Sequence, residues 1–173
     1  MEVRTADLND ADGLASCIVP TWLEAHRNQI PHHLWNRRQQ TWTVDVSASA
    51  WKRLLSGIAS EAESRSHVVV ATESEMIVGL VAGTVDDDGH GEVSALYVLP
   101  RHQRRGVGRR LLSSSLETLF DAGASSVSVV VLEANAPARQ FYENLGGIEV
   151  GSTDVDEDNE VLPAVIYRWT LDE

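Results

Sequence analysis

The chain has 173 residues, of which 43% are hydrophobic and 23% are charged, a composition typical of one soluble globular domain. This apolar content excludes a disordered chain, and a single cysteine excludes a disulfide framework. The net charge of −12 argues against binding to nucleic acid through a positive surface, and it favours a small cationic partner.

No apolar run in the sequence approaches the roughly 18–20 residues that a membrane-crossing helix needs. The first residues, from Met1 to Asp7, have neither the basic start nor the apolar stretch of a secretory signal. We therefore expect a cytoplasmic protein in a reducing compartment, with no membrane partner.

The first half of the chain predicts, in order, a strand, three helices and two strands, at residues 3–5, 11–27, 32–42, 46–57, 67–71 and 76–85. Asp10 is the expected N-cap of the first helix, and Pro20 is expected to kink or break it. The third helix is expected to end near Gly57, where a polar loop begins.

The second half predicts strands at residues 92–98, 126–132, 148–151 and 161–171. It predicts helices at residues 105–122 and 136–145, one between each successive pair of the first three of these strands. Two acidic runs, at residues 86–88 and 154–160, are expected in solvated loops. The order of elements indicates a mixed α/β domain whose sheet is antiparallel early and parallel in the middle, with no internal repeat and no second domain.

The most informative segment joins the strand 92–98 to the helix that follows it. It contains Gln103-Arg104-Arg105-Gly106-Val107-Gly108, and five of the 14 basic residues fall between Arg101 and Arg110. Free N–H groups at a helix start bind anions, and glycines let a ligand approach the backbone closely. The segment therefore predicts a pyrophosphate site.

Two other phosphate-binding patterns compete for this segment. The P-loop needs Gly-Lys-Ser/Thr, which is absent from the chain. The dinucleotide fingerprint needs a third glycine where this chain has Leu111, although the acidic Glu133 ends the next strand as that fingerprint requires. A nicotinamide dinucleotide stays open as the rival ligand.

A further pattern, Gln/Arg-x-x-Gly-x-Gly/Ala, is matched fully by residues 103–108, and the segment Asn135–Gly147 follows at the expected distance. With these two segments the sequence resembles the GNAT superfamily of N-acetyltransferases over most of residues 92–147. The resemblance implies a single acyl-CoA N-acyltransferase domain over residues 1–173, with a mixed sheet of about six to seven strands and helices on both faces. It also implies acetyl-CoA as co-substrate, held between the strand that ends at Val98 and the strand that ends at Leu132.

The resemblance assigns the co-substrate to residues of the strand, the loop and the later helix: Leu96, Tyr97, Val98, Gln103, Arg104, Arg105, Gly106, Val107, Gly108, Arg109 and Asn135. The strand residues are expected to offer backbone N–H and C=O groups to the pantetheine arm. Asn135 is expected to cap its helix and to reach the arm or an ordered water as well.

Two catalytic residues follow from the same resemblance. Tyr142 is expected to protonate the departing thiolate, although a packed core position would also account for it. Glu92 is expected to be the general base for the acceptor amine, with Glu133 or a chain of waters as the alternatives. The reaction is expected to be direct attack of a primary amine in a ternary complex, without a covalent enzyme intermediate.

The acceptor is less defined by the sequence. Trp22, Ile30-Pro31 and Leu34 resemble a bacterial branch of the family that includes polyamine acetyltransferases, a branch that often has an aromatic residue at the position of His26. Trp22 and His26 are the expected acceptor-binding residues, and the acidic charge favours a polyamine or another small cationic amine.

Other classes of protein remain as alternatives. The six histidines lack the spacing of a metal site, so no metal is expected. The leading alternative function is a non-catalytic acyl-CoA-binding or sensing domain of the same fold, and a scaffold for protein interaction is a second. Homodimers are frequent in the family that the chain resembles, but no part of the sequence identifies an interface, so both a monomer and a homodimer stay open.

Overall fold

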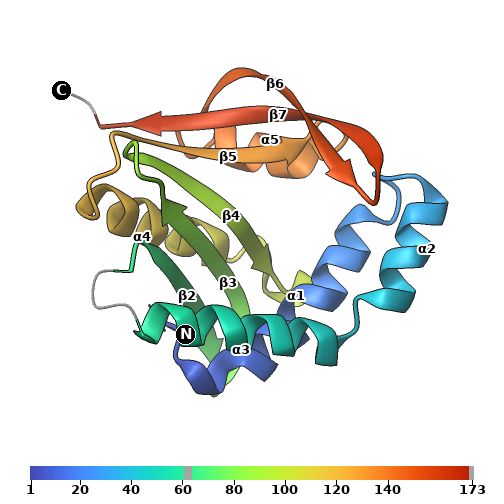
Figure 1. Cartoon of the computed structure of the whole chain (residues 1–173), viewed down its shortest axis with the longest axis horizontal. Helices are drawn as coiled ribbons and strands as arrows, with labels where there is room; N and C mark the ends of the chain where they lie inside the picture. Colours follow the sequence, from blue (N-terminus) through green and yellow to red (C-terminus); the bar gives the residue numbers. More distant parts are fainter. Residues whose placement is uncertain (61–63, 172–173) are drawn as a thin grey trace.

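Figure 1 shows the computed structural model, which describes residues 1–60 and 64–171. Its strands are β1 Glu2–Thr5, β2 Ser66–Glu73, β3 Met76–Val85, β4 His90–Val98, β5 Ser126–Leu132, β6 Ile148–Glu157 and β7 Glu160–Thr170. Its helices are α1 Ala11–His26, α2 His32–Thr41, α3 Val44–Ser60, α4 Val107–Asp121 and α5 Ala136–Glu143, with short 3-10 turns η1 Leu8–Asp10 and η2 Pro100–His102.

The strands form one seven-stranded sheet in the order β1-β2-β3-β4-β5-β7-β6. Only β4 and β5 run parallel, and the other neighbouring pairs run antiparallel. Helices cover both faces of the sheet, with α1 and α3 on one side and α4 and α5 on the other (Figure 1). The predicted mixed sheet with helices on both faces is confirmed.

Each face of the sheet has its own apolar core, because its helices present apolar side chains at helical spacing. Leu111 and Leu119 of α4 are fully buried against the central strands on one face. Leu14 and Ile18 of α1 are buried against β3 on the other face. Burying a leucine in this way contributes about 2 kcal/mol, and the two cores hold the sheet between two helical layers.

The two central strands diverge soon after they meet. β4 pairs with β5 only from His90 to Glu92, and beyond Glu92 it stays paired with β3 alone. The register of β4 against β3 also shifts, so that Ser94 is an extra residue in β4. A β-bulge of this kind bends its strand, and here the bend accompanies the gap that opens between β4 and β5.

Three predictions about the N-terminal helices are wrong in detail. α1 continues through Pro20, because Pro20 and Ser16 are exposed and water can bind the Ser16 carbonyl that the proline leaves unpaired. α3 continues past Gly57 to Ser60, and part of the predicted polar loop lies outside the described residues. Asp10 occupies the N-cap position but makes no capping bond there, since its carboxylate binds Arg4 and the Asp7 N–H instead.

Two further boundaries differ from the prediction. α4 begins at Val107 rather than at Arg105, because Gly106 has the left-handed conformation, with φ of +80°. β6 runs to Glu157, so most of the acidic run expected as a loop is strand. Cross-strand pairing with β7 outweighs the poor strand propensity of its aspartates.

Candidate active site

A cleft of about 1190 Å³ occupies the gap between β4 and β5 and extends to α1, α4, α5 and β6. It brings together most of the residues predicted from the sequence, which come from α1, β4, α4, α5 and the loops before the last two helices: Trp22, His26, Glu92, Leu96, Tyr97, Val98, Gln103, Arg104, Gly106, Gly108, Arg109, Asn135 and Tyr142. The side chains of Arg105 and Val107 do not line it.

One end of the cleft is the N-terminus of α4. The first turn of this helix leaves the N–H groups of Val107, Gly108 and Arg109 without partners inside the helix, and no side chain caps it. Arg104 and Arg109 line the same end of the cleft, and both are exposed. Unpaired N–H groups beside two guanidinium groups form a binding site for an anionic group such as a diphosphate.

Gly106 and Gly108 are required at their positions for different structural reasons. Gly106 has φ of +80°, a conformation that favours glycine, and a Cβ there would meet open space. A Cβ at Gly108 would lie 3.2 Å from the Phe141 ring. Gly108 therefore allows α4 to pack closely against α5, in addition to leaving the first turn open.

The basic residues of the loop do not all serve this anion site. Arg105 donates to Glu73 at 3.4 Å, and the buried His102 also contacts Glu73, at 3.0 Å. The hydrogen bond from His102 lowers the pKa of Glu73 below its usual value, with a smaller contribution from the charge of Arg105. Arg101 points toward the Met76 sulfur. The basic cluster therefore divides between the cleft and contacts with the β2–β3 turn.

Backbone groups of β4 line the middle of the cleft. The Leu99 N–H donates to the Val78 carbonyl at 2.9 Å, which makes these two residues a hydrogen-bonded pair. Because such pairs alternate along antiparallel strands, Leu96 and Val98 turn their N–H and C=O groups toward the gap. The Tyr97 backbone faces β3 instead, and this residue contributes its side chain. The Gln103 amide donates to the Val98 carbonyl at 2.9 Å, so one of the outward groups already has a partner.

α5 supplies the opposite wall of the cleft. Asn135 caps this helix by accepting from the Ala138 N–H at 3.2 Å, as expected, and it also lines the cleft. Tyr142 is buried and packs its ring against Phe141, Tyr167 and Trp169. Burial raises the pKa of Tyr142 well above its usual value, and Tyr97 adds to this rise. The phenol therefore keeps its proton at neutral pH.

The other end of the cleft is lined by residues of α1 and β6. His26 stacks on the Trp22 ring with centroids 4.5 Å apart, and it is buried. The guanidinium of Arg38 in α2, which does not line the cleft, lies 5.4 Å from the centroid of the same ring and pairs with Glu157 of β6. Glu157 lines the cleft, and burial, with a smaller contribution from the charge of Glu157, raises the pKa of Tyr97 to about 12.

The sequence analysis missed Glu157, which lines the cleft, and its partner Arg38, which does not. They lie 119 residues apart in the chain. Two similar pairs, His33 with Glu160 and Arg37 with Asp158, join α2 to the same hairpin. The sequence did carry a signal for these pairs, because residues 33–38 are basic and residues 157–160 are acidic. Opposite charge alone, however, does not predict contact between segments so far apart in the chain.

The two carboxylates considered as general base have different positions. Glu92 is exposed, lines the cleft and is the last residue of β4 that pairs with β5. Glu133 is exposed and does not line the cleft. The geometry therefore favours Glu92 over Glu133 as the general base. Because Glu133 does not line the cleft, it is also poorly placed to bind the ribose of a dinucleotide there.

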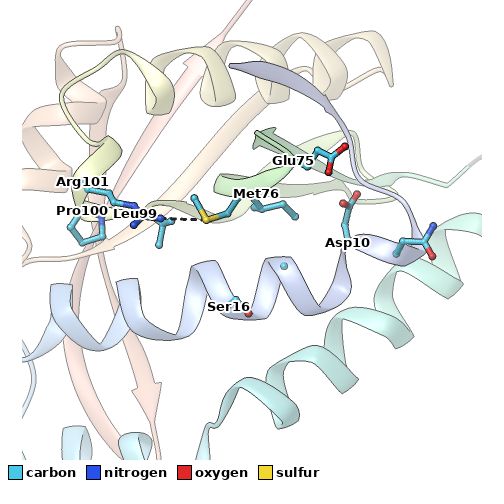
Figure 2. A pocket seen from close by; sticks show the side chains of 10 residues that line it. Asp10, Ser16, Glu75, Met76, Leu99, Pro100 and Arg101 are labelled. Atoms are coloured by element: carbon cyan, nitrogen blue, oxygen red, sulfur yellow. Dashed lines mark hydrogen bonds between the residues drawn. The ribbon is translucent and has the colours of Figure 1, made fainter. Parts of the chain in front are cut away.

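A second hollow, of about 670 Å³, lies between the start of α1 and the start of β3 (Figure 2). Asp10, Glu75 and Arg101 are among its lining residues. Asp10 is already engaged by Arg4, at 2.7 and 2.9 Å. None of the residues predicted for co-substrate or catalysis lines this hollow, so the cleft between β4 and β5 is the candidate active site.

Within residues 1–60 and 64–171, no helix is long and apolar enough to cross a membrane. The same part of the chain contains no group of three or more His, Cys, Asp or Glu side chains that could hold a metal ion.

Solved structures with the same fold include several acetyltransferases. The PaiA N-acetyltransferase from Thermoplasma acidophilum, in complex with coenzyme A, is similar over 98% of both chains, with a TM-score of 0.71 and 15% identity. The yncA protein from Salmonella typhimurium, solved with acetyl-CoA, covers 99% of this chain and 94% of its own, with a TM-score of 0.71 and 20% identity. At these identities the likeness concerns the fold.

The fold and the cleft define an enzyme that transfers acetyl groups. The sequence model of the Acetyltransferase (GNAT) family matches residues 28–147, so the chain belongs to this family. A relative from Bacillus subtilis, the uncharacterised N-acetyltransferase YuaI, is 32% identical over 146 residues, which cover 82% of this chain and 76% of the relative. The resemblance found in the sequence is confirmed.

Proposed function

We propose that the protein transfers the acetyl group of acetyl-CoA to the primary amine of a small cationic molecule. The observation that carries this proposal is one continuous cleft, in which the unpaired N–H groups of α4, the outward backbone of β4 and the phenol of Tyr142 line the same space. A domain that only binds acyl-CoA would need the first two features but not the phenol.

The residues present fit acetyl-CoA from end to end. The first turn of α4, with Arg104 and Arg109, suits the diphosphate. The outward N–H and C=O groups of Leu96 and the N–H of Val98 suit the amides of the pantetheine arm, which would add to β4 like another strand. When bound, acetyl-CoA supplies the acyl group as a thioester.

Three groups of the chain would act on the reacting atoms. Backbone N–H groups of β4 would stabilise the oxygen that becomes negative as the amine attacks. Tyr142 would donate its proton to the departing sulfur, which its raised pKa permits. Glu92 would accept a proton from the amine. Burial raises the pKa of Cys17 to about 12, which argues against a thiolate nucleophile and supports direct transfer.

The acceptor end of the cleft supports a cationic amine. The charged side chains of the cleft lining include Glu24, Glu92 and Asp154, and the guanidinium of Arg38 in α2 is paired with Glu157. An acceptor with a free carboxylate would meet these acids, whereas a polyamine or another cationic amine would be attracted by them.

Calorimetric titration with acetyl-CoA, with NADH in a parallel run, tests the co-substrate. Micromolar binding of acetyl-CoA alone is expected, and binding of NADH in its place would reject the proposal. Release of CoA thiol in the presence of spermidine, a monoamine and a free amino acid then tests the transfer, and acetyl-CoA binding without any release would favour the non-catalytic alternative.

The remaining expectations stay part of this proposal. We propose that residues 1–173 act as one N-acetyltransferase domain in the cytoplasm, without a metal and without nucleic acid. Homodimerisation is tested by light scattering of the purified protein with and without acetyl-CoA.

A further inference from the structure

His26 is a titratable residue of the cleft for which the proposed mechanism has no role. It is buried at the end of α1, with 7% of its surface exposed, and it is one of the residues that line the cleft. Its Nδ1 lies 2.9 Å from the Trp22 carbonyl, and Nε2 has no hydrogen-bond partner among the described residues. Because a carbonyl can only accept, Nδ1 carries the hydrogen and Nε2 has the free lone pair.

The surroundings of His26 suit a group that is neutral at rest and charged for a short time. Burial lowers its pKa below the usual value, so the ring is neutral at pH 7. Glu157 of β6 acts in the opposite direction and would stabilise an imidazolium. Other charged and titratable groups of the same cleft are Tyr97 and Glu92 of β4, Asp154 of β6 and Glu24 of α1, and Arg38 of α2 lies over the Trp22 ring on which His26 stacks.

Two protons leave the acceptor nitrogen in this reaction. A primary ammonium group carries three protons on nitrogen, and the amide product carries one. One of the two protons that leave replaces the proton that Tyr142 gives to sulfur. The other must reach solvent, and a second base that lines the cleft can carry it there.

We propose that His26 accepts one of the two protons that the acceptor amine loses, and that Glu92 accepts the other. In this step an N–H bond of the ammonium breaks, its electron pair stays on nitrogen, and the proton bonds to Nε2 of His26. The imidazolium then returns its proton to water, and the proton held by Glu92 replaces the one that Tyr142 gives to the sulfur, so that all three side chains regain their starting states. The inference rests on the proposed acetyltransferase function.

The pH dependence of kcat/KM for the amine separates this role from a structural one. We expect the wild-type profile to fall at low pH as His26 becomes protonated, in an ionisation that burial places below the usual pKa of histidine. His26→Gln is expected to lose this ionisation and about 100-fold in kcat, with unchanged acetyl-CoA affinity. His32→Gln, which removes an exposed histidine outside the cleft, is the matched control and should keep the wild-type profile.

Two measurements keep the inference testable if the glutamine variant folds poorly. Imidazole added to His26→Ala should restore at least tenfold of the lost rate, because a free base can replace the missing one. Nitrogen NMR of histidine-labelled wild type at pH 7 should show His26 neutral with its hydrogen on Nδ1.

The outcomes distinguish this inference from the proposed function. A wild-type protein that acetylates no amine rejects the function and the inference together. An active wild type whose profile is unchanged in His26→Gln, or an NMR spectrum with the hydrogen on Nε2, rejects the inference alone.

Discussion

The two ends of the cleft are built by different means. The end proposed for acetyl-CoA consists mainly of backbone groups, from the first turn of α4 and the outward edge of β4, which are neighbours in the chain. The end proposed for the acceptor is lined by side chains of α1 and the β6–β7 hairpin, and ion pairs such as Arg38–Glu157 join that hairpin to α2. A backbone site depends on local geometry, whereas a side-chain site can change by substitution without altering the fold.

The largest effect on ligand binding is expected from Gly108→Glu, in the first turn of α4 at the end of the cleft proposed for acetyl-CoA. Its side chain would meet the Phe141 ring and would place a carboxylate beside the N–H groups meant for the diphosphate. We expect acetyl-CoA affinity to fall more than 100-fold by calorimetry, or about 3 kcal/mol. Gly57→Glu places the same residue on α3, where a Cβ meets nothing within 4 Å, and it should bind acetyl-CoA normally.

Tyr142→Phe tests the chemistry between the two ends. Removal of the phenol should lower kcat by about 30- to 100-fold, while acetyl-CoA affinity and melting temperature change little. Tyr167→Phe is the matched control, because its hydroxyl binds Glu143 at 2.7 Å and lies outside the cleft lining. That control should lose stability and keep kcat, and equal kcat in both variants would remove Tyr142 from the mechanism.

Arg38→Met tests the side-chain end. Loss of the guanidinium leaves Glu157 unpaired and loosens the contact between α2 and the hairpin. We expect KM for the amine to rise about three- to tenfold, with acetyl-CoA affinity unchanged. Lys52→Met removes an exposed ion pair with Asp12 and should change neither value. A loss of acetyl-CoA affinity in Arg38→Met would contradict the separation of the two ends.

The smallest effect on the cleft is expected from Asp10→Asn, which lies outside both ends. The hydrogen bond from Arg4 lowers the pKa of Asp10, so its charge stabilises the fold at neutral pH. The variant should lose about 1–2 kcal/mol of unfolding free energy at pH 7. Since a lowered pKa contributes stability only above the unfolded value of about 3.9, this difference should shrink as pH falls below 4. Urea unfolding at pH 7 and pH 3 measures it, and activity per folded molecule should not change.

The same contrast explains where prediction from sequence succeeded. The strand at residues 126–132, the amphipathic pattern of α4 and the loop before it depend on residues close in the chain, and the structure agrees with them. Prediction failed where distant contacts outweighed local preference, as in β6, which pairs with β7 despite its aspartates. The different roles of Gly106 and Gly108 also depend on α5, and no spacing within the loop reveals it.

The sequence by itself determined the class of protein, through the two segments that resemble the family, at residues 103–108 and 135–147. It also predicted where an anion would bind, because helix starts and glycines act over a few residues. Only the tertiary structure decided which arginines face the cleft and which pair with Glu73. It also decided that the Trp22 carbonyl leaves Nε2 of His26 without a partner, and that Arg38 meets Glu157. These features depend on contacts between elements far apart in the chain, and packing of the whole sheet sets them.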